Sequence, residues 1–432
     1  WTLLLWRCFS YLSSPSAQMS SQVRLRLLPR SSCLFDEPFR LKVSGLRSRQ
    51  LVALTARSTD QKGVEFSSRA SYRADGSGEV HLDRDPSLGG SYAGVEPMGL
   101  LWSMRPDSSH RKLVIRNSLH PHVVKFSVHE QDGDGRLLAE AANERLLIGD
   151  GVVRRPVRGE HFQGVLFTPP GEGPFCAVLD LSSYTCEIRP SLLASKGFVV
   201  LAVAVHSSKL VNMNVMHLDL FEEALNFLKK QPKVSRLSIG IVARSQGADV
   251  ALSLAAFVPG VEAVVWINGC GANISVPLHY KNSQILSPLS MDVDKVIHTE
   301  SGARVIKYIV GNPLAEENKG SVVPIEQATG QFLFVAAEDD LGWDSKAFMG
   351  QMVERLKSRG RNNFEVVTYP KAGHLLEAPY GPYCPSSVHG LLHFPVMWGG
   401  EPRFHAAAEV HLWEKVQEFL KTHLKCDVKS KL

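Results

Sequence analysis

Residues 237–257 read LSIGIVARSQGADVALSLAAF, and the hydrophobic pattern changes at Ser245. The apolar run before Ser245 is typical of a buried β-strand, and the run after it is compatible with a helix. A serine in a tight strand–turn–helix connection can be a strained nucleophile, usually in the pattern Gly-x-Ser-x-Gly. Ala243 occupies the position of the first glycine, and we expect the turn to tolerate this small side chain. The alternative is that Ser245 only caps the helix.

The sequence around Ser245 separates it from the other serines that precede a glycine by two positions. Ser87, Ser195 and Ser358 also stand in Ser-x-Gly, but each has a larger side chain two positions earlier. A bulky residue there obstructs the tight turn. The spacing therefore favours Ser245 as the candidate nucleophile.

Strand-like and helical patterns alternate on both sides of this segment. The apolar runs that predict buried strands are 176–181, 198–205, 237–243, 261–268, 332–339 and 364–370. Amphipathic helices are predicted over 217–231 and 409–424. This alternation predicts a mostly parallel sheet covered by helices on both faces. The stretch 271–331 interrupts the alternation and is a candidate cap or lid beside the site.

The preceding part of the chain has a different pattern. Short alternating runs at 39–46, 50–58, 112–117 and 123–130 predict strands without intervening helices, which is typical of a β-sandwich. With 432 residues, the chain is long enough for two domains. We expect a sandwich domain over 31–150 and an α/β domain over 151–425, with an extension at 1–30 and a tail at 426–432.

Composition excludes several classes of function. The net charge of +5 is small and no basic stripe is interleaved with aromatic residues, so we expect no nucleic-acid partner. The longest apolar run is far below the ~20 residues of a membrane span. The seven cysteines form no C-x-x-C pair, which favours reduced thiols and argues against a structural zinc. We therefore expect a monomer without metal or cofactor.

The two ends of the sequence carry conflicting targeting features. Ser430, Lys431 and Leu432 form the SKL signal that a peroxisomal import receptor binds at a free C-terminus. Residues 1–35 contain arginines and serines but no acidic residue, a composition that resembles a mitochondrial transit peptide. We treat 1–30 as a disordered, targeting or non-native extension. The expected location is the peroxisome, with the mitochondrion or cytosol as alternatives.

A nucleophilic serine needs a base and an acid that orients the base. On sheets of this type the acid and then a histidine follow the serine, each after a later strand. His374 follows the strand-like run 364–370, and Asp339 and Asp340 end the run 332–339. Spacing alone does not separate the two aspartates.

Three longer strings indicate a known family. LGGSYAGVEPMGLLW (88–102), AGHLLEAPY (372–380) and WGGEPRFHA (398–406) resemble the acyl-CoA thioesterase / bile acid-CoA:amino acid N-acyltransferase family. The similarity extends from about Asp36 to Leu424. It implies an N-terminal β-sandwich followed by an α/β-hydrolase domain, and an acyl-CoA substrate.

The resemblance also implies roles for individual residues. The family's triad falls on Ser245, on the second aspartate of DDLGW, which is Asp340, and on His374. Backbone N–H groups of Gln246 and of the loop that starts at Ser182 would bind the oxyanion. This chain departs from the family in two places: the elbow reads ARSQGA, and the family's glycine-rich loop is replaced by the shorter SSYTC at 182–186.

Three functions are compatible with these features. The first is hydrolysis of fatty acyl-CoA through an acyl-serine intermediate. The second is transfer of the acyl group to glycine or taurine; the conjugating members characteristically use cysteine, so Ser245 favours hydrolysis. The third is a weakly active paralogue that binds acyl-CoA, because a loop without glycines disfavours close approach of the backbone to the substrate.

Overall fold

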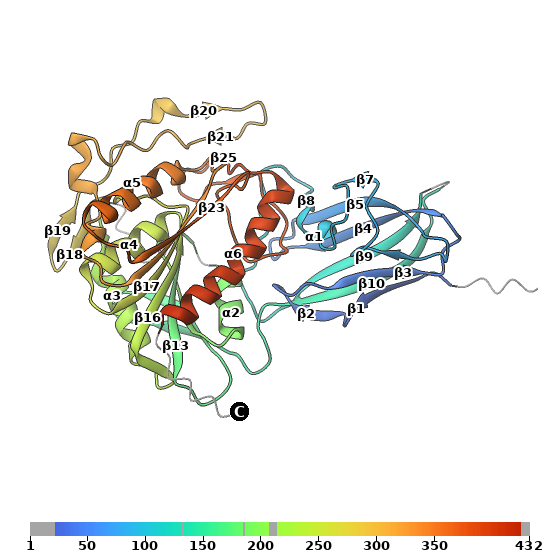
Figure 1. Ribbon diagram of the computed structural model, residues 1–432, viewed down its shortest axis with the longest axis horizontal. Coiled ribbons are helices and arrows are strands. Elements are labelled where there is room, and N and C mark those ends of the chain that lie inside the picture. Colours follow the sequence, from blue (N-terminus) through green and yellow to red (C-terminus); the bar gives the residue numbers. More distant parts are fainter. Residues whose placement is uncertain (1–21, 132–133, 185, 207–213, 425–432) are drawn as a thin grey trace, which may run out of the picture.

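The computed structural model describes residues 22–131, 134–184, 186–206 and 214–424 (Figure 1). The described chain forms an N-terminal all-β part and a larger part in which helices cover a central sheet. The C-terminal tail with the SKL signal, and most of the segment 1–30, lie outside the described residues.

Two sheets make up the N-terminal part. The first is three-stranded, in the order β1 (Arg24–Leu28), β3 (Arg40–Ser44), β6 (Val80–His81). The second has the order β2 (Ser32–Leu34), β10 (Leu137–Leu146), β9 (His122–Glu130), β4 (Leu51–Thr59), β5 (Glu65–Arg73), β7 (Gly89–Gly90), with β8 (Arg105–Pro106) also paired to β5.

The core of this part lies between the two sheets. Along β5 every second side chain is buried, as expected for a strand with one face on a core. The apolar ones among them, Phe66, Ala70 and Tyr72, join one cluster with Leu27 of β1, Val43 of β3 and Phe126 of β9. A short helix, α1 (Gly99–Trp102), packs its apolar residues into the same cluster. This arrangement confirms the predicted β-sandwich.

Two details of the sequence prediction are wrong. The segment 1–30 was set apart from the folded domains, yet β1 lies within it and pairs with β3 over its whole length. Residues 112–117 do not form a strand. Their backbone is held by side chains instead: Asp60 accepts from the N–H of Val114, and Gln61 accepts from the N–H of Arg116.

The second part is built on an eight-stranded sheet. Its order is β11 (Val153–Arg158), β12 (Gln163–Thr168), β14 (Val199–Ala204), β13 (Phe175–Ser182), β16 (Val234–Arg244), β17 (Val261–Ile267), β22 (Gln331–Ala337), β23 (Phe364–Tyr369). The pairs from β14 to β23 are parallel, and β11 and β12 are antiparallel. All six predicted strands are present.

Helices cover both faces of this sheet. One apolar cluster joins the sheet to α3 (Leu218–Lys229), α4 (Gln246–Phe257) and α5 (Ser345–Ser358). The cluster on the opposite face contains side chains of α2 (Ile188–Ser195) and α6 (Pro402–His423), which crosses the sheet in Figure 1. The two buried faces explain why the parallel strands read as continuous apolar runs.

The excursion 271–331 contains short strands and 3₁₀ turns. They are β18 (Leu278–Tyr280), β19 (Ser283–Leu286), η1 (Val293–Lys295), β20 (Ile297–His298), β21 (Arg304–Val305), η2 (Glu316–Ser321) and η3 (Ile325–Gln327). Its strands pair with segments outside it: β18 with β15 (Met216–His217), and β21 with β25 (Pro395–Met397), which pairs with β24 (Ser386–Val388).

The two parts are joined through a buried carboxylate. Asp36 accepts a hydrogen bond from the indole of Trp413 on α6 (2.8 Å) and forms an ion pair with Lys196 (2.7 Å). Within the described ranges, no helix is long and apolar enough to cross a membrane, and no cluster of ligand-type side chains could hold a metal ion. Cys176 is disulfide-bonded, contrary to the expectation of reduced thiols, whereas Cys33, Cys186, Cys270 and Cys384 are free.

Candidate active site

Ser245 lies in a tight turn between β16 and α4. Its backbone has φ 57° and ψ −135°, a region that a non-glycine residue occupies at a cost of about 1–3 kcal/mol. The surrounding sheet holds this conformation, since the Ser245 N–H donates to the carbonyl of Ile267 (2.9 Å). Ala243 is fully buried between its sheet partners Leu181 and Trp266.

The glycine two positions after Ser245 has a steric reason. A Cβ on Gly247 would lie 2.7 Å from the carbonyl oxygen of Leu181, so any side chain there would push α4 away from β13. Of the two glycines in the pattern Gly-x-Ser-x-Gly, the contact of α4 with β13 therefore requires the second one, Gly247. Alanine at the first position causes no such conflict, which is consistent with the expected tolerance.

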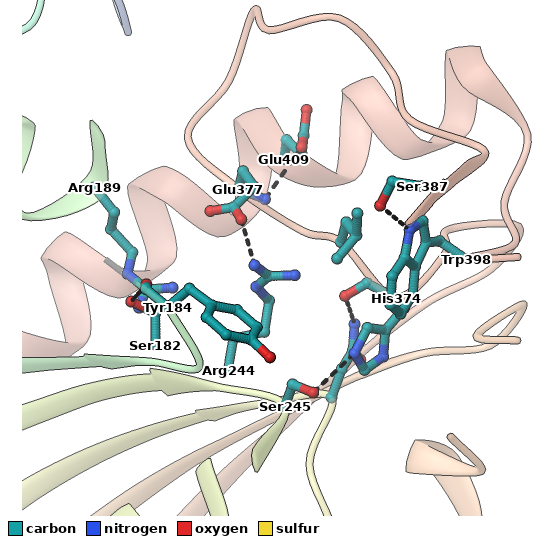
Figure 2. A network of polar contacts seen from close by, with 12 residues as sticks. Ser182, Tyr184, Arg189, Arg244, Ser245, His374, Glu377, Ser387, Trp398 and Glu409 are labelled. Carbon is teal, nitrogen blue, oxygen red and sulfur yellow. Dashed lines mark hydrogen bonds and ion pairs between the residues drawn. The ribbon is translucent and has the colours of Figure 1, made fainter. Parts of the chain in front are cut away.

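His374 follows β23 and is held over Ser245 (Figure 2). Its Nε2 is 3.0 Å from Ser245 Oγ, within hydrogen-bond distance. The ring stacks on Trp398 with 5.2 Å between centroids, and the His374 N–H donates to the Trp398 carbonyl (2.8 Å). Asn268 donates from its amide to the His374 carbonyl (2.9 Å). Packing and backbone bonds therefore fix both the position and the plane of the imidazole.

Asp340 lies on the other side of the imidazole. Its Oδ2 is 2.8 Å from His374 Nδ1 and also accepts from the Ser345 hydroxyl (2.6 Å). The second oxygen, Oδ1, accepts from the N–H groups of Gly342 (2.8 Å) and Trp343 (2.9 Å). Both oxygens of this buried carboxylate are hydrogen-bonded, as a buried charge requires.

The neighbouring aspartate has a different set of contacts. Asp339 accepts from the N–H of Gly400 (2.7 Å) with its side chain, and its own N–H donates to the Ala372 carbonyl (3.0 Å). A Cβ on Gly399 would lie 1.8 Å from the Asp339 carbonyl oxygen. Asp339 therefore holds the Trp398–Gly400 segment in place, and Asp340 is the aspartate that contacts His374.

Gln246 and Ser182 were the candidate oxyanion residues. Gln246 is the first residue of α4, where backbone N–H groups have no partner within the helix. Ser182 ends β13, and its carbonyl accepts from the Val205 N–H (2.9 Å), on the side of β14. The N–H and C=O of one strand residue point to the same side, so the Ser182 N–H faces β14 and away from β16.

A largely apolar pocket opens beside Gln246. Its wall comes mainly from the ends of β14 and α3 and from segments near 215 and 276; the side chains that line it include Val203, Val205, Leu220, Phe221, Val276 and Leu391. His206 and Gln246 supply polar groups to this wall. The pocket therefore offers an apolar group a place next to the first residue of α4.

One hydrogen bond orders two polar side chains of the pocket wall, His206 and Gln246. Burial lowers the pKa of His206, against the opposing effect of its bond to Gln246, so the ring is neutral. His206 Nε2 donates to Gln246 Oε1 (2.6 Å), and the buried Gln246 Nε2 finds no acceptor among the described residues. Sequence patterns did not indicate His206, because a histidine ending a buried strand has no distinctive spacing. Ser345, Asn268 and the stacking of Trp398 were also missed.

Comparisons with known proteins give independent evidence of the family to which this chain belongs. Two family models match: the acyl-CoA thioester hydrolase/BAAT N-terminal region over residues 36–159 and the BAAT / acyl-CoA thioester hydrolase C-terminal region over 216–426. The chain is 41% identical to human acyl-coenzyme A thioesterase 6, covering 93% of this chain and 96% of the relative. It is 39% identical to human acyl-coenzyme A thioesterase 2, mitochondrial, covering 96% and 89%.

Solved structures give a more distant likeness. An acylaminoacyl peptidase from Pyrococcus horikoshii aligns at a TM-score of 0.41 and 13% identity, covering 91% of this chain and 61% of that one. The family assignment rests on the relatives that match along nearly the whole sequence. From these matches, the chain belongs to the acyl-CoA thioester hydrolase/BAAT family.

Proposed function

We propose that this chain hydrolyses fatty acyl-CoA to a free fatty acid and coenzyme A through an acyl-serine intermediate. The observation that carries the proposal is the hydrogen-bonded series Ser245–His374–Asp340 in a member of this family. The three side chains follow three separate strands of one sheet, β16, β22 and β23, and meet at its carboxyl edge.

The geometry suits nucleophilic catalysis followed by hydrolysis. His374 takes the Ser245 proton as Oγ attacks the thioester carbonyl, and Asp340 stabilises the imidazolium that forms. The N–H of Gln246 stabilises the charge on the carbonyl oxygen. The C–S bond then breaks, and the thiol of coenzyme A leaves with the proton from His374. Water, deprotonated by His374, attacks the acyl-serine and releases the acid.

The apolar pocket beside Gln246 is the proposed site of the acyl chain. Burial of each methylene in such a pocket contributes roughly 0.8 kcal/mol. Since this binding is shared by substrate and transition state, kcat/KM should increase with chain length until the chain fills the pocket, whose lining includes Leu220 and Phe221 of α3. Enlarging that wall with Leu220→Trp should shorten the preferred acyl chain.

The central test measures release of free thiol from acyl-CoA substrates of increasing chain length. We expect Ser245→Ala to lower kcat by ~10⁵–10⁶, by analogy with removal of the serine from other triads. A fluorophosphonate should label the wild type and not this variant. Labelling without measurable turnover of any acyl-CoA would contradict the proposal.

Product analysis separates hydrolysis from transfer. Acyl-CoA is incubated with the protein and excess glycine or taurine, and free acid and conjugate are quantified. We expect free acid to dominate, because the conjugating members characteristically use cysteine and the proposed nucleophile here is Ser245. Conjugate formed faster than acid would assign the chain to the N-acyltransferases instead.

We also propose delivery to the peroxisome through Ser430, Lys431 and Leu432, which lie outside the described residues. A fluorescent protein fused ahead of this chain should reach peroxisomes, and deletion of the three residues should abolish the import. Cytosolic fluorescence of the fusion, with or without the three residues, would contradict this location.

A further inference from the structure

The end of β13 lies against the start of α4, where a Cβ on Gly247 would be 2.7 Å from the Leu181 carbonyl oxygen. The Ser182 N–H faces β14, as described above, and the next carbonyl, of Ser183, accepts from the His206 N–H (3.0 Å). The chain therefore continues toward β14 after the strand. A second donor for the oxyanion must come from elsewhere on this segment.

Tyr184 is the residue that turns back toward the nucleophile. The Ser182 hydroxyl donates to the Tyr184 carbonyl (3.0 Å), which closes a tight turn and fixes the backbone of the tyrosine. In Figure 2 the Tyr184 side chain extends from the end of β13 toward Ser245. Tyr184 therefore lies in a loop at the edge of the candidate active site.

Two contacts hold the tyrosine ring in this direction. The ring lies 5.7 Å from the ring of His206, which is bonded to Gln246, the residue after the nucleophile. On the other side the ring contacts Gly390, where an added Cβ would lie 2.5 Å from the Tyr184 hydroxyl oxygen. The absence of a side chain at Gly390 gives the phenol its space.

The hydroxyl itself is available as a donor. It makes no hydrogen bond to any of the residues that the structure describes. Burial raises the pKa of Tyr184 to about 12, so the phenol keeps its proton at neutral pH. A protonated hydroxyl next to a position where negative charge develops can stabilise it by a hydrogen bond.

We propose that the Tyr184 hydroxyl is the second oxyanion donor of this active site, opposite the N–H of Gln246. It replaces the backbone N–H that a glycine loop would supply at the end of β13. The hydroxyl donates a hydrogen bond to the thioester oxygen and keeps its proton, so the steps of acyl transfer are unchanged. This inference rests on the proposed nucleophile Ser245, and not on the identity of the acyl group.

The test compares the wild type with Tyr184→Phe, which keeps the ring and its contacts with His206 and Gly390. We expect kcat for acyl-CoA and the rate of Ser245 acylation by p-nitrophenyl acetate to fall about 10²-fold. KM should change little. Affinity for an alkyl trifluoromethyl ketone, which forms an oxyanion with the serine, should fall by a similar factor. Affinity for an S-alkyl-CoA thioether, which forms none, should not change.

A second variant addresses another unpartnered donor near Ser245, the side-chain amide of Gln246 on α4. Gln246→Leu removes the side-chain amide and leaves the backbone N–H. If Gln246→Leu, and not Tyr184→Phe, weakens ketone binding, the side chain of Gln246 is the donor and the proposal is wrong. It is equally overturned if Tyr184→Phe lowers the rates while ketone affinity stays at the wild-type value. Melting temperatures of all variants show whether the fold is retained.

The ester assay keeps this inference separate from the proposed function. If the wild type reacts with p-nitrophenyl acetate through Ser245 but hydrolyses no acyl-CoA, the proposed substrate is wrong. The comparison of Tyr184→Phe with the wild type on the ester and the ketone still decides the role of the tyrosine.

Discussion

The two sides of Ser245 are built differently. On the side of His374 and Asp340, buried backbone and side-chain groups bond every polar atom that orients the proton transfer. On the side of β13, the bond from the Ser182 hydroxyl to the Tyr184 carbonyl and the ring contacts of Tyr184 with His206 and Gly390 orient the tyrosine that extends toward Ser245. The difference indicates that the groups proposed for proton transfer are held by more contacts than the segment on the other side of Ser245.

The structural context explains this difference. Asp340 and His374 lie on loops anchored to β22 and β23 and to Trp398, whose side chain is buried. Their geometry is therefore determined by the packing of the core. The end of β13 lies at the surface of the site, where Tyr184 is about one-third exposed (36%). Loops at such positions can shorten without disturbing the sheet.

The largest expected effect separates two adjacent aspartates. Asp340→Asn should lower kcat by about 10⁴, because an amide can neither accept from His374 Nδ1 as a carboxylate does nor stabilise the imidazolium. Asp339→Asn keeps an oxygen that can accept from the Gly400 N–H, so we expect a loss of less than about tenfold. Steady-state hydrolysis of one acyl-CoA by both variants measures the difference. Equal losses of kcat in the two variants would show that Asp340 has no special role in orienting His374.

Much of the arrangement could be predicted from the sequence. The parallel strands are buried on both faces and therefore appear in the sequence as apolar runs. The predicted strand segments for this reason match the strands of the sheet in the same order. Ser245 could be predicted because the turn is tight and only small residues fit around it. His374 could be predicted because it directly follows the last strand of the sheet.

Other features depend on contacts that no local pattern encodes. Spacing could not separate Asp339 from Asp340, because the choice depends on how the loop turns toward Gly342 and Trp343. Residues 112–117 alternate like a strand, but side chains of Asp60 and Gln61 take their backbone bonds. The direction of the Ser182 N–H follows from pairing with β14, which is a property of the register.

A smaller effect is expected where α4 meets β13, because this contact joins the two sides. Gly247→Ala places a Cβ 2.7 Å from the Leu181 carbonyl oxygen, and the helix must move to relieve the conflict. A shift of this kind misaligns Ser245 and the Gln246 N–H together, so we expect kcat to fall by about 10–10². Gly350→Ala on α5 is the control, since nothing lies within 4 Å of its added Cβ. Unchanged kcat in Gly247→Ala would mean that the two sides are not coupled through this contact.

The smallest expected effect is a pH-dependent change in the stability of the fold, caused by a buried carboxyl group one helical turn after Ser245. Asp249 on α4 is buried; its Oδ1 accepts from the Cys270 N–H (2.6 Å) and its Oδ2 has no partner among the described residues. Burial raises the pKa of this carboxyl well above 3.8, and the bond from Cys270 only partly opposes the shift. Above pH 3.8 the unfolded chain therefore releases a proton that the folded chain keeps. This contribution to stability is complete below pH 3.8 and is lost as pH rises through the folded pKa.

Asp249→Asn removes this titration while keeping an oxygen for the Cys270 N–H. The melting temperature of the variant minus that of the wild type should increase as the pH rises above 3.8 toward the folded pKa. Asp294→Asn, the same substitution at an exposed position, is the control and should show no such trend. The neighbouring Cys270 thiol has a pKa raised by burial, so it stays neutral over this range. A constant difference across pH would show that Asp249 is already ionised, and that the protein tolerates a buried charge one helical turn from Ser245.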